Sequence, residues 1–198
     1  MLSTASATWA GRRFWELQER KASFLTLLAD QLVASGVYST VVIVPFAVAG
    51  TPIALWGTGG SLNEKLSSVL ASLPSGYKVT EMIWHQGESD YESRMATADY
   101  VERFRSFLAT LRAYGVLAPV FIAIASKCRM PWNRGNAVAA AQLVLIDDWN
   151  VFLGADTDSM LLEDDRYDNC HMSESGMRKT AAAFFSAIEQ RRRSAQGR

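Results

Sequence analysis

Four short, mainly apolar runs alternate with segments whose apolar residues recur at helical spacing, and the run at 41–48 is apolar at nearly every position. A strand that is apolar on both faces needs cover on both faces, which is the situation of strands in a parallel sheet. The expected strands are residues 41–48, 79–85, 119–125 and 151–155, and the expected helices are residues 13–35, about 61–73, about 100–115, 136–148 and 173–188. This order predicts an α/β fold with a mostly parallel sheet and helices on both faces.

The length of 198 residues and the hydrophobic content of 49% fit one domain over residues 1–198, with frayed ends at 1–12 and 190–198. Twenty basic and twenty acidic residues cancel, so net charge gives no reason to expect nucleic acid or an anionic membrane as partner. No run of about 18 apolar residues and no signal-peptide pattern is present. We therefore expect a soluble protein, and the sequence gives no further localisation.

Proline and cysteine add two local expectations. Pro45 cannot donate to a strand ladder, so strand 41–48 is expected at an edge or beside a free position. Cys128 and Cys170 lack CxxC spacing, which argues against a structural zinc site. The favoured interpretation is two small buried side chains, and a bridge between them is the alternative.

The polar motif Trp84-His85-Gln86-Gly87-Glu88-Ser89-Asp90 directly follows the strand at 79–85. Right-handed crossovers bring the carboxyl ends of parallel strands to one edge, where ligands of such sheets bind. Gly50-Thr51, this motif and the segments 126–135 and 156–171 all follow expected strands. The chain's two histidines, in the second and fourth of these segments, can therefore meet.

The residues at this edge point to acyl transfer. Asp168 precedes His171 by three residues, so its carboxylate can hold the Nδ1 proton and leave Nε2 as a general base. Gly50 offers a backbone N–H and Gln86 a side-chain N–H, and two such donors aimed at one point form an oxyanion hole.

The Trp84–Asp90 motif, together with Val48-Ala49-Gly50-Thr51-Pro52-Ile53 and Asp168-Asn169-Cys170-His171, resembles the sialate O-acetylesterase-type carbohydrate esterases of the SGNH/GDSL hydrolase superfamily. The resemblance covers about residues 14–188. It implies a flavodoxin-like three-layer sandwich that hydrolyses O-acetyl esters on carbohydrates without a metal or other cofactor. It also implies roles for nine residues: His171 as base, Asp168 as its partner, Gly50 and Gln86 as oxyanion donors, and Thr51, His85, Gly87, Glu88 and Asp90 as supports of the motif loop.

One part of the family pattern has no counterpart. Such enzymes begin with a strand that ends in a Gly-Gln-Ser-Asn-like block carrying the nucleophile, whereas Ser3 and Ser6 have neither a preceding apolar strand nor those neighbours. The first strand would lie between 41–48 and 79–85. We therefore expect an N-terminally incomplete esterase, either inactive as given or completed by a missing segment, by a donated strand or in a homo-oligomer.

Two alternatives remain open. A metal-dependent hydrolase would use His85, Glu88, Asp90 and His171, although their spacing falls short of the usual zinc patterns. A non-catalytic carbohydrate-binding remnant would retain the cleft without the nucleophile. Trp56, Trp84 and Trp132 follow strand ends and could stack on sugars in either case, or belong to the core. The sequence identifies neither the sugar nor the acetyl position.

Overall fold

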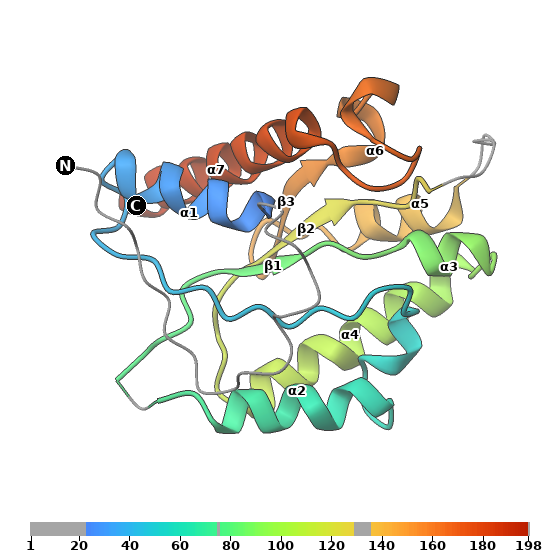
Figure 1. Ribbon diagram of the computed structural model, residues 1–198. Coiled ribbons are helices and arrows are strands. Elements are labelled where there is room, and N and C mark those ends of the chain that lie inside the picture. The colour runs from blue at the N-terminus through green and yellow to red at the C-terminus, as the bar shows by residue number, and fades with distance from the viewer. Residues whose placement is uncertain (1–22, 75, 129–135, 198) are drawn as a thin grey trace, which may run out of the picture.

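A sheet of three parallel strands forms the centre of the molecule in a computed structural model that describes residues 23–74, 76–128 and 136–197. The strands β1 (Met82–Trp84), β2 (Val120–Ile124) and β3 (Val151–Asp156) lie in that order, with Met82 opposite Val120 and Val120 opposite Val151 (Figure 1). Three of the four expected strands are present, and the predicted α/β class with a parallel sheet is confirmed.

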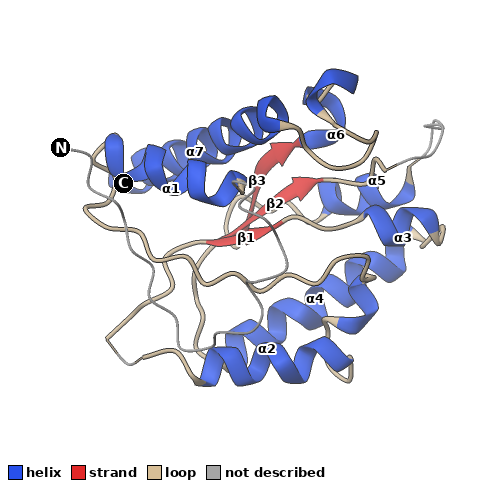
Figure 2. Cartoon of the chain, in the orientation of Figure 1, coloured by secondary structure: helices blue, strands red, loops and turns tan. Residues whose placement is uncertain are grey.

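Helices cover both faces of the sheet (Figures 1 and 2). Helices α1 (Phe24–Ala34) and α7 (Glu174–Gln196) pack on one face, and α2 (Ser61–Ala71), α4 (Thr97–Ala113) and α5 (Ala137–Val144) pack on the other. All of β2 is buried because its side chains alternate between the two cores: Val120 and Ile122 join the α2/α4/α5 side, and Phe121 and Ala123 join the α1/α7 side.

Four short helical elements were not expected. They are η1 (Ile53–Leu55), α3 (Glu88–Glu92), α6 (Thr157–Met160) and η2 (Glu163–Asp165). Each is at most five residues long, too short to show a helical period in sequence. They occupy the connections that carry the candidate site residues.

The predicted strand at residues 41–48 is wrong. This segment is extended but belongs to no ladder of the described residues, and Figure 2 draws it as loop. Val41 packs against the α1/α7 core and Phe46 against the other core, whereas Val42 is 57% exposed. An apolar, β-branched run becomes a strand only beside a partner, and no such neighbour lies between it and β1 in the described part of the chain.

Of the two expected frayed ends, only the C-terminal one includes described residues. Residues 1–12 lie outside the described residues, as does the first part of the expected helix 13–35, which is described only from its N-cap Ser23 onward. Residues 190–196 instead continue α7, so fraying there was wrong. Arg192 anchors this end: its guanidinium donates to the Tyr38 hydroxyl at 2.8 Å and lies 4.7 Å from the ring centroid.

Among the residues that the structure describes, no helix is both long enough and apolar enough to cross a membrane.

Candidate active site

The carboxyl ends of the strands are connected to one another by side-chain bonds. Gln86, after β1, donates to Thr51 O at 3.1 Å, and Gln142 Nε2 on α5 donates to Gln86 O at 2.7 Å. After β2, the backbone N–H of Ser126 donates to Asp158 Oδ1, after β3, at 3.0 Å. The segments that the sequence placed at one edge therefore do meet there.

His171 and Asp168 form a hydrogen-bonded pair. Nδ1 of His171 lies 2.7 Å from Asp168 Oδ2, and the backbone N–H groups of His171 and Cys170 donate to Oδ1 at 2.7 and 3.1 Å. Burial opposes ionisation of the Asp168 carboxyl, but these three hydrogen bonds outweigh it and lower its pKa to about 2. The imidazole is 56% exposed, so the pair has the orientation and access of a general base with its carboxylate partner.

A disulfide holds the loop that carries this pair. Cys128, just after β2, is bonded to Cys170, the residue before His171. The favoured interpretation of two unpaired buried cysteines is therefore wrong, and the bridge that was the alternative is correct. The ring of Tyr167 also stacks on the His171 imidazole at 5.6 Å between centroids. The base is thus held by a covalent link and a ring contact besides the Asp168 carboxylate.

Gly50 and Thr51 form a tight turn. Gly50 has φ +67°, a left-handed conformation that glycine adopts without strain, and its backbone N–H has no hydrogen-bond partner among the described residues. Thr51 holds the turn, because its hydroxyl donates to Val48 O at 2.8 Å and accepts from Trp56 Nε1 at 3.2 Å. The turn therefore leaves the Gly50 N–H available as a donor among the described residues.

The side chain of Gln86 is fixed at both ends of its amide. Nε2 donates to Thr51 O at 3.1 Å and to Asp90 Oδ2, while Oε1 accepts from the Tyr100 hydroxyl at 3.0 Å. Because an amide nitrogen has two hydrogens, both are in use here. An oxyanion would take the one that now goes to Thr51 O.

Asp90 and Gly87 shape the motif loop. Asp90 is buried, and its Oδ2 accepts from the Ile53 N–H at 2.9 Å as well as from Gln86. Burial raises the pKa of the Asp90 carboxyl, and Oδ1 has no hydrogen-bond partner among the residues that the structure describes. Gly87 has φ +153°, and a Cβ there would lie 2.0 Å from Ala125 O, so the loop has no space for a larger residue. Glu88 is the first residue of α3.

The other aromatic and histidine candidates lie elsewhere. His85 packs on Phe24 of α1, with ring centroids 5.8 Å apart. Trp56 is 5% exposed and packs edge-on against Trp84 at 5.4 Å, so both are core residues without a free face for a sugar. Trp132 lies outside the described residues.

The described residues contain no hydroxyl hydrogen-bonded to Nε2 of His171. Ser126, at the carboxyl end of β2, is wholly buried, and its hydroxyl donates to Asp158 and accepts from Asn136. That serine is a structural bridge between β2 and β3. Ser3 and Ser6 lie outside the described residues.

His85, Glu88, Asp90 and His171, the four residues of the metal-dependent alternative, do not gather around one point. Within residues 23–74, 76–128 and 136–197, no three histidine, cysteine or acidic side chains are placed to hold one metal ion.

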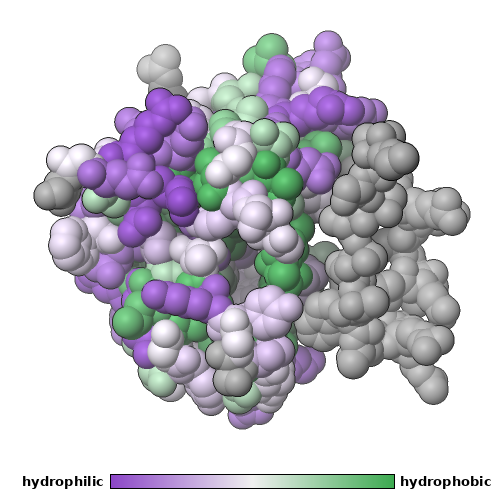
Figure 3. Space-filling model, turned by 90° about the vertical axis from the view of Figure 1, so that its left-hand side faces the viewer, coloured by the Kyte–Doolittle hydropathy of each residue, from purple (hydrophilic) through white to green (hydrophobic). Residues whose placement is uncertain are grey.

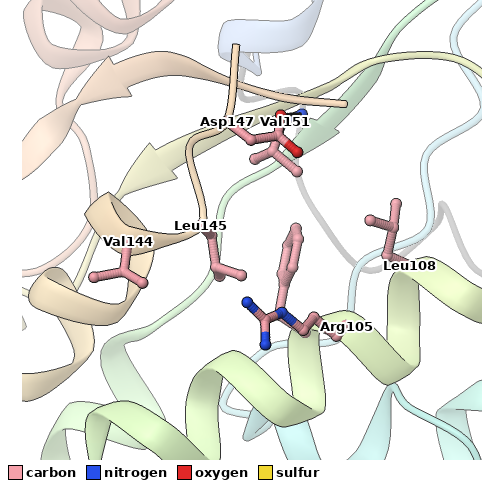
Figure 4. Close-up of a pocket in the computed structure, with 7 residues that line it drawn as sticks. Arg105, Leu108, Val144, Leu145, Asp147 and Val151 are labelled. Carbon is pink, nitrogen blue, oxygen red and sulfur yellow. Dashed lines mark hydrogen bonds between the residues drawn. The ribbon is translucent and has the colours of Figure 1, made fainter. Parts of the chain in front are cut away.

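A small pocket lies at the other end of the sheet. Its volume is about 130 Å³, and it lies between α4, α5 and Val151, the first residue of β3. Figure 4 shows Arg105 on α4 and Asp147 on opposite sides of it. It contains none of the candidate residues, so it is separate from the site described above.

Two residues that the sequence did not single out belong to the site. Tyr100 and Gln142 are wholly buried, and both contact Gln86. Tyr100 was counted among the apolar positions of its helix. Gln142 is the only polar side chain in Ala137–Val144, and a single amide in an apolar helix was a signal that could have been used.

Comparison with known proteins gives one family and three related folds. Residues 17–190 match the model of the family described as carbohydrate esterase, sialic acid-specific acetylesterase. No curated protein matches the chain.

Three solved structures share the fold. A protein from Arabidopsis thaliana is 21% identical with a TM-score of 0.63, covering 84% of this chain and 66% of its own. A carbohydrate esterase family 3 protein from Talaromyces cellulolyticus is 12% identical with a TM-score of 0.60, and the match covers 85% of this chain and 90% of that protein. An acetyl esterase with one serine replaced by alanine, solved with acetate, is 13% identical with a TM-score of 0.59. This match covers 88% of this chain and 93% of that protein. The chain thus spans slightly less than two thirds of the plant protein.

Proposed function

Because this chain belongs to the carbohydrate esterase family of sialic acid-specific acetylesterases, we propose that it removes O-acetyl groups from sugars by serine-type acyl transfer. The observation that carries the proposal is the His171–Asp168 pair, which lies at the same sheet edge as the donors of Gly50 and Gln86. A base, a carboxylate that orients it and two N–H donors are the groups that this reaction needs.

In the proposed reaction, Nε2 of His171 takes the proton of the attacking hydroxyl. At the same time, the oxygen of that hydroxyl adds to the acetyl carbonyl carbon. Nδ1 keeps its hydrogen, shared with Asp168 Oδ2 at 2.7 Å, so the imidazolium forms beside an anion. Nε2 then gives its proton to the departing sugar oxygen, and an acetyl ester on the nucleophile remains. Water, deprotonated by the same Nε2, cleaves that ester and releases acetate.

Gly50 and Gln86 are the proposed donors to the negative carbonyl oxygen of the intermediate. The Gly50 N–H has no competing acceptor among the described residues. For Gln86, the hydrogen bond to Asp90 holds the amide, while the one to Thr51 O at 3.1 Å is the bond that an oxyanion replaces. The Gly50 N–H is therefore available before the substrate arrives, whereas the Gln86 N–H becomes available only as its bond to Thr51 O is exchanged.

We infer that the nucleophile comes from a segment outside the described residues, inserted as a strand between β1 and residues 41–48. In the described part of the chain, β1 pairs only with β2, and its other edge has no ladder partner. Val42 and Val44 are exposed on the facing segment. Figure 3 shows a recess at mid-height of this face, bordered by a mixture of apolar and weakly polar residues. A further segment of the same polypeptide is the proposed source, and a strand donated by a second copy is the alternative.

A non-catalytic carbohydrate-binding protein is the second candidate. One observation favours it: no serine hydroxyl contacts Nε2 of His171 among the described residues. Such a protein would retain the cleft and bind O-acetylated sugar without cleaving it.

Hydrolysis of p-nitrophenyl acetate and of an O-acetylated sugar separates the two candidates. The esterase proposal expects release of acetate from both, loss of activity in His171→Ala, and inactivation by a serine-directed organophosphate. Asp164→Ala, an exposed acidic residue in the same connection, is the matched control and should keep activity. A folded chain that binds the sugar and releases no acetate would support the binding protein instead.

A further inference from the structure

Tyr100 brings a single hydroxyl to the centre of the motif. It lies on α4, is 0% exposed, and accepts hydrogen bonds from Trp84 Nε1 and Gln142 Nε2, each at 3.3 Å. A phenol hydroxyl has two lone pairs and one hydrogen. Since two N–H donors face the lone pairs, the hydrogen is left for Gln86, whose Oε1 at 3.0 Å is a nearer acceptor than its main-chain O at 3.3 Å.

This bond is one of three that fix which way the Gln86 amide points, and it is the only one of the three made to Oε1. With Oε1 directed to the Tyr100 hydroxyl, Nε2 faces Thr51 O and Asp90 Oδ2, on the side of the Gly50–Thr51 turn. The reversed amide would point its oxygen at the Thr51 carbonyl and the Asp90 carboxyl. Burial raises the pKa of Tyr100, so its hydroxyl keeps the hydrogen that it donates.

The main chain at this point is fixed separately, by Gln142. Its Nε2 donates to Gln86 O at 2.7 Å and its Oε1 accepts from the Ala125 N–H at 2.9 Å, so the ends of β1 and β2 are joined. Gly87 packs against the same group, because a Cβ there would lie 2.6 Å from Gln142 Nε2. With the backbone held, rotation of the Gln86 side chain is the freedom that remains, and the Tyr100 hydroxyl restricts it.

We propose that Tyr100 is a positioning residue of this site, which holds the Gln86 amide with its N–H₂ toward the developing oxyanion. The proposal rests on the proposed function, in which Gln86 is an oxyanion donor. Tyr100 itself touches neither substrate nor nucleophile, and it acts through Gln86.

The test is a double-mutant cycle in the full chain with an acetyl ester. Tyr100→Phe keeps the buried ring and removes only the hydroxyl, and we expect kcat to fall about tenfold, with KM changed by less than about twofold. In a Gln86→Ala background the same substitution should change kcat by less than about twofold, because the group that it positions is gone. Equal losses in both backgrounds would overturn the proposal.

Thr110→Val is the matched structural control. Thr110 is a buried residue of the same helix whose hydroxyl bonds to Asn63 and Ser106, away from the site. It should lower the melting temperature by an amount similar to Tyr100→Phe and leave kcat unchanged. A loss of kcat in Thr110→Val equal to that in Tyr100→Phe would mean that loss of a buried hydroxyl, and not positioning, explains the effect.

Acetate binding provides a readout that does not need the nucleophile. We expect the acetate Kd, measured by NMR titration, to rise about fivefold in both Tyr100→Phe and Gln86→Ala and to stay constant in Thr110→Val. If the wild-type chain cleaves no ester, this titration still decides the role of Tyr100, because acetate binding needs neither turnover nor a nucleophile. An acetate Kd that Tyr100→Phe leaves unchanged, or absence of acetate binding to the wild-type chain, would overturn the proposal.

Discussion

His171 and Asp168 are three residues apart, and one short loop carries both halves of the proposed base. Asn169 between them has φ +62°, a left-handed conformation that asparagine tolerates better than most residues, so the chain can turn back sharply. The turn allows Oδ1 of Asp168 to accept two backbone N–H groups while Oδ2 takes Nδ1 of His171. The loop's backbone and its catalytic geometry therefore depend on one carboxylate.

Asp168→Asn should lower kcat on an acetyl ester about 100-fold or more, with little change in KM. The asparagine amide has one oxygen instead of two and adds an N–H₂, so it cannot both cap the turn and hold the Nδ1 proton. Asp164→Asn, at an exposed neighbouring carboxylate, is the control and should retain full activity. Equal activity of the two variants would remove Asp168 from the mechanism.

The acid-side pH dependence of that activity follows from the pKa of Asp168. Hydrogen bonds lower this pKa to about 2, so the carboxylate is ionised above about pH 4. A fall in wild-type kcat/KM between pH 7 and 5 must then come from another group, and the wild-type profile should show no step near pH 4, the usual value for a carboxyl group. A step near pH 4 that disappears in Asp168→Asn would contradict this assignment.

At the scale of elements, the disulfide joins the connection after β2 to the loop before α7. Cys128 and Cys170 are 42 residues apart, and closing a loop of that length stabilises the folded state by up to about 4 kcal/mol in the chain-entropy model. Cys128→Ser/Cys170→Ser should therefore unfold at a lower urea concentration than the oxidised wild type and hydrolyse ester more slowly, since the loop with His171 is released. Treating the wild type with dithiothreitol should give the same two changes. An unfolding midpoint that is insensitive to dithiothreitol would show that the bridge does not contribute.

Asp165 fastens η2 to the start of α7. Its carboxylate accepts from Lys179 Nζ at 2.7 Å, from the Leu162 N–H at 3.0 Å and from Ser175 Oγ at 2.8 Å, and these bonds lower its pKa to about 2. A depressed pKa stabilises the folded chain above the unfolded value near 4, and the stabilisation is lost as pH falls toward 2. Asp165→Asn should thus lower the melting temperature at pH 7. Between pH 4 and 2, the melting temperature of the variant should decrease less than that of the wild type. Parallel melting curves of the variant and the wild type across that range would contradict this linkage.

The elements that sequence predicted well are those whose pattern is local. Val120–Ile124 is apolar throughout and lies buried between two helix layers, and Ser173 caps α7 as its position suggested. The Asp168–His171 spacing likewise placed both residues in one loop. Residues 41–48 have the same local pattern as β2, but a strand also needs a neighbour, which the pattern cannot supply. The contacts of Tyr100 and Gln142 were missed because they depend on packing between α4, α5 and the motif.

At the scale of the whole molecule, the sheet divides the core into two clusters that both continue toward residues 41–48. Val41 packs on the α1/α7 side and Phe46 on the α2/α4/α5 side, so the segment is held at its ends. Between them, Val42 and Val44 are exposed, and β1 has an open edge in the described part of the chain. An extended segment without a ladder partner and a strand with one unpaired edge, both in the described part of the chain, are the arrangement that a further strand would complete.

Hydrogen exchange tests this arrangement. In the chain as given, amides of residues 41–44 should exchange at least about 100-fold faster than those of Val120–Ile124, since only the latter are bonded in ladders on both sides. Pairing with a further segment that carries the serine should slow exchange at residues 41–44 and at β1, leave β2 unchanged, and raise esterase activity together with that protection. Slow exchange at residues 41–44 in the chain as given would mean that the segment already pairs with a strand, and the proposed position for the nucleophile strand would then be wrong. Protection that appears only at high protein concentration, with dimers in sedimentation, would instead assign the added strand to a second copy.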